Sequence, residues 1–230
     1  MRAQHILAVL CCATLLSGCM GNDSSSEEES NVEVTLQAIV NDQQPYPVTA
    51  NIRALDIDLD GVEEVVFTEP IAGRIGWVES ECVTTFCNET LIENLGSPVR
   101  VSAADLDSNG ITELIVADIG ILYPSNEKSG RVITIEGNTT TVLVEGLGRT
   151  VCAEPADLDG DNDLDLTICE FGHDEGSISW LEQAGDGNWT LHTIDARPGS
   201  IHAYPIDIDL DGDMDIIASV SQNSEDVMLY

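Results

Sequence analysis

A nine-residue acidic pattern occurs four times in this chain and limits its possible folds more than any other feature. In the last copy, at 207–215, aspartates stand at positions one, three, five, seven and nine, and Gly212 stands at position six. The other copies begin at Asp56, Asp105 and Asp157, so successive copies start 49, 52 and 50 residues apart. Such a period over most of a 230-residue chain predicts a repeat architecture.

The residue types in this pattern predict a calcium loop. Ca²⁺ prefers oxygen ligands from carboxylates and backbone carbonyls, and the Gly or Asn at position six suits the positive φ of a tight turn. Carboxylates held close together repel one another unless a divalent cation lies between them. An acidic turn without metal is the alternative. The candidate ligands are the side chains at positions one, three, five and nine and the backbone carbonyl at position seven: Asp56, Asp58, Asp60, Val62 and Glu64; Asp105, Asp107, Asn109, Ile111 and Glu113; Asp157, Asp159, Asp161, Asp163 and Asp165; Asp207, Asp209, Asp211, Asp213 and Asp215.

The segments after each copy favour strands over the helices of an EF-hand. An EF-hand needs a Glu at position twelve, but Phe67, Val116, Ile168 and Ala218 stand there. The segments 64–68, 113–117, 165–169 and 215–219 are short and rich in apolar and β-branched residues. We therefore expect each loop to join two strands.

Two more strands can be recognised in most periods. Third strands are expected at 74–79, 131–136, 177–182 and 226–230, and fourth strands near 90–95, 139–145 and 189–194. Four strands in about 50 residues is the size of a propeller blade. The predicted fold class is all-β, a β-propeller of four-stranded blades with four blades visible, either a complete ring or part of a larger one.

These features resemble the FG-GAP and VCBS-type repeats of integrin α-subunit propellers and bacterial surface proteins. The resemblance covers most of 32–230 and rests on the four loops and on Trp180-Leu-Glu182 followed by Gly185-Asp-Gly-Asn188. The chain has no Phe-Gly…Gly-Ala-Pro cage, so it is more similar to the bacterial branch than to integrins. Members of the family usually have about seven blades.

The number of blades leaves two alternatives open. The last period stops at Tyr230 within its third strand, and the segment 35–39 aligns with the fourth strand at 190–194. This first segment could complete the last blade and close a four-bladed ring without exposed edges. The chain could equally be the front part of a longer protein, which the stop inside a strand favours.

The N-terminus has the features of an export signal. An apolar run at 6–16 is too short to span a bilayer, and Leu16-Ser-Gly-Cys19 resembles a bacterial lipobox. The expected domains are a lipoprotein signal peptide at 1–18, lipid-bearing Cys19 and a disordered acidic tether at 19–31, and the propeller at 32–230. An ordinary cleaved signal peptide is the alternative. Resemblance to Gram-negative lipoproteins implies the outer membrane or cell surface.

Charge and cysteines constrain the partners and the compartment. The formal net charge is −34 with only eight Lys and Arg, which opposes binding to nucleic acid or to an anionic membrane surface. The lipid is then the only expected membrane contact. An oxidising compartment would allow two disulfides, for which we expect the pairs Cys82–Cys87 and Cys152–Cys169.

The sequence contains no recognisable catalytic motif. His173, His192 and His202 lie in different periods, and neither a Gly-x-Ser-x-Gly nor a His-Glu-x-x-His sequence occurs. We therefore expect a calcium-binding interaction or adhesion module, not an enzyme, with an unidentified protein or glycan ligand at the cell surface. The alternatives are a non-catalytic or partial propeller of a carbohydrate-active enzyme, of the polysaccharide lyase or dehydratase type, and a structural spacer.

Overall fold

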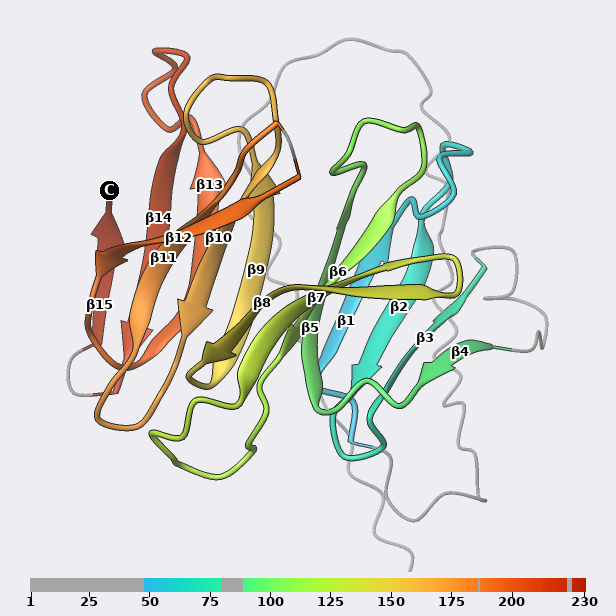
Figure 1. Ribbon diagram of the computed structural model, residues 1–230, viewed down its shortest axis with the longest axis horizontal. Helices are drawn as coiled ribbons and strands as arrows, with labels where there is room; N and C mark the ends of the chain where they lie inside the picture. Colours follow the sequence, from blue (N-terminus) through green and yellow to red (C-terminus); the bar gives the residue numbers. More distant parts are fainter. Residues whose placement is uncertain (1–47, 80–88, 186, 223–224) are drawn as a thin grey trace, which may run out of the picture. The chain divides into compact units, whose positions relative to one another are not determined.

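The computed structural model describes residues 48–79, 89–185, 187–222 and 225–230, and these residues form an all-β structure. Fifteen strands make four antiparallel sheets that follow one another along the chain (Figure 1). Within each sheet the strands are paired in sequence order. We call the sheets blades 1 to 4. Among the described residues, no helix is long and apolar enough to cross a membrane.

The blades have the strand content that the sequence predicts. Three blades have four strands and the last has three, and no strand pairing joins blade 4 to blade 1 within the described residues. The predicted fold class is thus confirmed, whereas the segment 35–39 lies outside the described residues. Blade 1 comprises β1 (Asn51–Leu55), β2 (Glu64–Glu69), β3 (Arg74–Val78) and β4 (Thr90–Glu93); blade 2 comprises β5 (Pro98–Ala104), β6 (Glu113–Asp118), β7 (Gly130–Glu136) and β8 (Thr139–Leu147); blade 3 comprises β9 (Thr150–Ala156), β10 (Asp165–Glu170), β11 (Ser177–Gln183) and β12 (Trp189–Asp195); blade 4 comprises β13 (Ser200–Ile206), β14 (Asp215–Ser221) and β15 (Glu225–Leu229).

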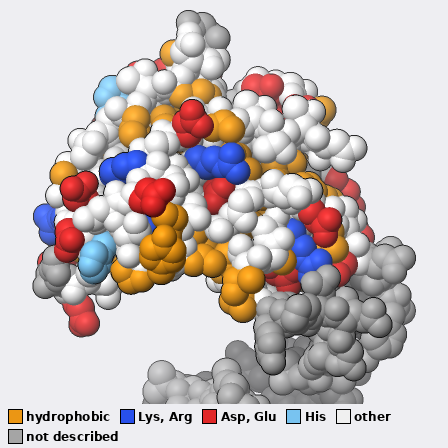
Figure 2. Space-filling model, turned by 60° about the horizontal axis from the view of Figure 1, so that its bottom comes forward, with side chains coloured by type: hydrophobic (Ala, Val, Ile, Leu, Met, Phe, Trp, Pro, Cys, Tyr) orange, Lys and Arg blue, Asp and Glu red, His pale blue; other side chains and the backbone are white. Residues whose placement is uncertain are grey.

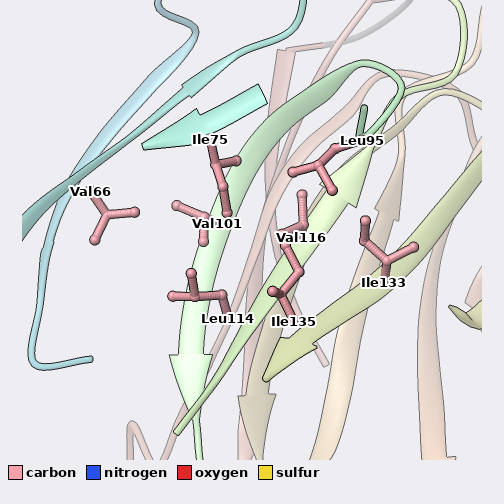
Figure 3. Close-up of a cluster of buried hydrophobic side chains, with 8 residues drawn as sticks. All are labelled: Val66, Ile75, Leu95, Val101, Leu114, Val116, Ile133 and Ile135. Atoms are coloured by element: carbon pink, nitrogen blue, oxygen red, sulfur yellow. The ribbon is translucent and has the colours of Figure 1, made fainter. Parts of the chain in front are cut away.

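The hydrophobic core lies between neighbouring blades. Figure 3 shows the cluster between blades 1 and 2, to which Val66 and Ile75 contribute from blade 1 and Val116 and Ile133 from blade 2. Two further clusters join blade 2 to blade 3 and blade 3 to blade 4. Each fully buried Val or Ile contributes about 1.5–3 kcal/mol relative to an exposed one, so the contacts between blades hold the sheets together.

The burial of the second strands reflects this stacking. Every residue of β6 and β10 is buried, because a blade packs against each face of these strands. In β14, buried residues alternate with more exposed ones, since only one of its faces has a described neighbour. On the other face of blade 4, Tyr204, Val227 and Leu229 are exposed.

A disulfide bond joins Cys152 of β9 to Cys169 of β10. The two residues are direct partners in the antiparallel register and lie in the core between blades 3 and 4. This is the pairing that the sequence analysis expects for these cysteines. Cys82 and Cys87 lie outside the described residues.

Candidate metal centres

The four acidic loops bring their carboxylates together in the same way. Each loop connects the first strand of a blade to the second, and position nine is the first residue of β2, β6, β10 or β14. In every loop, the carboxylates at positions one, three and nine have oxygen atoms within 4.8 Å of one another. The four groups are Asp56, Asp58 and Glu64; Asp105, Asp107 and Glu113; Asp157, Asp159 and Asp165; Asp207, Asp209 and Asp215.

Backbone amides of the loops fix these carboxylates. The carboxylate at position one accepts a hydrogen bond from the amide of position six at 2.9–3.1 Å in all four loops. The carboxylate at position nine accepts one from the amide of position two at 2.7–3.1 Å. Hydrogen bonds to ionised groups are stronger than those between neutral groups, so both ends of each loop are firmly held.

Position five has a different role from positions one, three and nine. The side chains of Asp60, Asn109, Asp161 and Asp211 accept hydrogen bonds from the amide of position seven at 2.8–3.0 Å. None of them belongs to the three-carboxylate groups. Their role as ligands, and that of the position-seven carbonyls of Val62, Ile111, Asp163 and Asp213, remains a prediction.

The loop backbone is left-handed at two positions. Position six has positive φ, as the sequence predicts, with values of 74° at Asn162 and 102° at Gly212. Position four is also left-handed, with φ of 61° at Leu59, 56° at Ser108, 63° at Leu210 and 79° at Gly160. The sequence analysis missed position four, where only Gly160 could have indicated it.

Three of the position-nine carboxylates are buried. Glu64, Glu113 and Asp165 are 2%, 6% and 1% exposed, whereas Asp215 is half-buried. Burial raises the pKa of the Glu64, Glu113 and Asp165 carboxyls, and neighbouring loop carboxylates raise it further. These groups are therefore harder to ionise without a cation than free carboxylates are.

The donor set fits a hard divalent cation. Each group offers carboxylate oxygens only, the type of ligand that Ca²⁺ binds. In the first loop, Oδ1 of Asp56 is buried and has no hydrogen-bond partner. A buried carboxylate oxygen without a partner is costly, and a cation held by Asp56, Asp58 and Glu64 would offset that cost.

A second repeated polar feature lies at the other end of the second strands. Glu69, Asp118 and Glu170, the last residues of β2, β6 and β10, are all buried. Arg74 pairs with Glu69, and Nε of Arg131 lies 2.8 Å from Oδ2 of Asp118. In blade 3, Glu170 instead accepts a hydrogen bond from the Ser177 hydroxyl at 2.8 Å and contacts Lys128 at 3.2 Å. The sequence analysis missed these residues, although each acidic residue follows position nine by five residues.

Each Lys and Arg in the described part of the chain has a protein partner. On the first strands, Nη1 of Arg53 lies 2.8 Å from Glu154, which also faces Arg100 at 3.9 Å. Arg197 pairs with Asp195 at 2.6 Å. Arg149 donates to backbone carbonyls and lies over the Phe171 ring. On the face seen in Figure 2, Lys and Arg side chains lie beside acidic ones.

The three histidines in the described part of the chain do not form a common site. Nε2 of His192 lies 2.6 Å from Glu182, and its ring packs on Trp180 with the ring centroids 4.9 Å apart. His202 stacks on Tyr204, and the His173 carbonyl accepts a hydrogen bond from Gln222. The described histidines thus make separate contacts, and ring packing is seen for His192 and His202.

The stacked antiparallel meanders, each with an acidic loop before its second strand, define a propeller-type repeat protein. The family model of the FG-GAP-like repeat matches residues 157–218, from the third acidic loop into β14 of blade 4. These residues are thus similar to an FG-GAP-type repeat, which confirms the resemblance expected from the sequence over this part of the chain. No curated protein matches the chain.

Proposed function

We propose that this chain is a calcium-dependent interaction module of the cell surface. The observation that carries the proposal is the fourfold occurrence of a three-carboxylate group at the start of a second strand. A calcium ion in each loop would link positions one and three to the strand that begins at position nine. The metal would thereby stabilise the first hairpin of every blade and leave the other loops free to contact a ligand.

The proposed location is the outer membrane or cell surface of a Gram-negative bacterium. The lipobox-like sequence before Cys19 supports a lipid anchor, and the polar segment 21–30 supports a tether between lipid and propeller. We propose a protein or glycan as the ligand. The net charge of −34 and the pairing of the described basic side chains argue against nucleic acid.

A role as part of a carbohydrate-active enzyme has less support. A small cavity of about 160 Å³ lies among the first strands and is lined by Arg53, Ser102, Glu154 and Tyr204. A basic cavity at this place would favour an enzyme that acts on an anionic polysaccharide. Glu154 instead neutralises the charge of Arg53, which supports a structural role for this pair.

Thermal unfolding with calcium and with a chelator tests the proposal. A metal that binds only the native chain raises its stability by about 2.7 kcal/mol per site at a hundredfold excess over the dissociation constant. We expect a large increase in Tm with calcium for the chain without its signal peptide, and a stoichiometry of about four in calorimetric titration. An unchanged Tm would contradict calcium binding.

A further inference from the structure

Two equivalent cavities lie beside acidic loops at neighbouring blade boundaries. The cavity between blades 1 and 2 has a volume of about 210 Å³ and is lined by Trp77 and Glu79 beside the first loop. The cavity between blades 2 and 3 has a volume of about 320 Å³ and is lined by Thr134 and Glu136 beside the second loop. The second cavity is thus the larger of two versions of one repeated feature.

One substitution within the repeat explains the difference in size. Trp77, Thr134 and Trp180 occupy the same position, because each pairs with the third residue of the second strand in its blade. Trp77 packs against the core between blades 1 and 2. Trp180 packs on His192 of its own blade. The smaller Thr134 in blade 2 leaves open the space that the indole ring of Trp77 fills in blade 1.

The residues around this space indicate a ligand rather than a packing defect. Thr134 is only 7% exposed, lines the cavity, and its hydroxyl forms no hydrogen bond with any described residue. A hydroxyl group of a ligand in the cavity could supply that hydrogen bond. Thr139, Thr141 and Glu136 also line the cavity, and Trp189 of blade 3 adds an aromatic residue to its wall.

The chemistry of the lining selects the class of ligand. Hydroxyl groups of a sugar can donate to Glu136 and exchange hydrogen bonds with the threonines, and a sugar ring can pack on the indole of Trp189. Glu136, which is not a candidate calcium ligand, leaves a negative charge in the wall, and no Lys or Arg lines the cavity. An anionic ligand would be repelled. The volume lies at the lower end of the range for small-molecule sites, as expected for a single sugar ring.

We propose that the cavity between blades 2 and 3 binds a neutral sugar ring, as part of a glycan. The inference rests on the proposed function as an interaction module and names the class of its ligand. Blade 2 carries the site because it has Thr134 where blades 1 and 3 have tryptophan.

Titration of the calcium-loaded chain with neutral monosaccharides tests this site. The probes are D-glucose, D-galactose, D-mannose and N-acetyl-D-glucosamine, and binding is followed by saturation-transfer NMR and tryptophan fluorescence. We expect at least one of these sugars to bind saturably. Thr134→Trp gives blade 2 the side chain of its neighbours and should abolish that binding. Glu136→Gln keeps the shape of the cavity and should weaken binding about tenfold, because a charge-assisted hydrogen bond is lost.

Glu79→Gln is the matched control, since Glu79 occupies the same place beside the smaller cavity of blade 1. This variant should keep the affinity of the unmodified chain. If none of the four sugars binds saturably, or if binding survives both Thr134→Trp and Glu136→Gln, the inference is wrong. Calcium-dependent stabilisation, measured on the same samples, tests the proposed function separately. A chain stabilised by calcium that binds none of the sugars would overturn this inference alone.

Discussion

Position four of each acidic loop is held in a backbone conformation that most side chains disfavour. Leu59 and Leu210 have φ of 61° and 63°, although a left-handed residue with a Cβ costs about 1–2 kcal/mol. The following residues donate their amides to the carboxylate at position one. The left-handed turn therefore aims the amides at the acidic group, and the hydrogen bonds offset the strain.

Gly160 and Leu210 allow a reciprocal test of this strain. A Cβ at Gly160 would meet no atom within 4 Å, so Gly160→Ala changes only the backbone preference. We expect this substitution to lower the free energy of unfolding by about 1 kcal/mol and Leu210→Gly to raise it by a similar amount. Urea unfolding in calcium measures both. A stabilising Gly160→Ala would contradict the assignment of strain to position four.

At the scale of strands, the sequence predicts the strands whose residues repeat at a fixed spacing from the acidic loops. The apolar runs at 64–68 and 113–117 closely match β2 and β6, and the expected third strand at 177–182 corresponds to β11. The buried ion pairs could not be predicted in this way. Arg74 follows Glu69 by 5 residues, whereas Arg131 follows Asp118 by 13, because the connection between second and third strands varies in length.

The candidate site was predictable to a similar extent. The pattern identifies the carboxylates at positions one, three and nine because their residue types recur at fixed spacing. It does not distinguish them from position five, since an Asp inside the three-carboxylate group and an Asp outside it look the same in a sequence. That distinction depends on how the loop backbone directs each side chain.

The ion pair at the end of β6 should contribute strongly to stability. Arg131→Met leaves the Asp118 carboxylate, 3% exposed, without its cation. Removing one partner of a fully buried pair costs about 3 kcal/mol; because Arg131 is itself 34% exposed, we expect a smaller loss, about 2 kcal/mol, in denaturant unfolding. Arg197→Met removes the more exposed pair with Asp195 and should cost less than about 1 kcal/mol. Equal losses in the two variants would show that burial does not determine the strength of these pairs.

At the scale of the whole molecule, the fold gathers carboxylates in the loop before the second strand of every blade. The net charge is −34, and each acidic loop holds three carboxylates close together at the start of a second strand. Because the core lies between blades, these loops flank the same contacts that hold the sheets together. Charge repulsion in the loops therefore lowers the stability of all the packed blades.

The pH dependence of stability should reverse when calcium is removed. In the presence of a chelator, burial raises the pKa of the Glu64, Glu113 and Asp165 carboxyls above their values in the unfolded chain. The native state then binds protons more tightly, so its stability is greatest below the unfolded pKa and falls as pH rises through the folded pKa. Acidification from about pH 7 to about pH 5 should raise the Tm of the chelated chain.

With calcium present, the same acidification should lower the Tm. Protons compete with the metal for these carboxylates, so the stabilisation that calcium provides is lost as they become protonated. Thermal melts at the two pH values, with calcium and with chelator, measure both slopes. Parallel slopes in the two series would mean that calcium and protons do not share the buried carboxylates, and the metal would then have to lie elsewhere. Opposite slopes would show that calcium and protons compete for the buried position-nine carboxylates, and that this competition changes the stability of the packed blades.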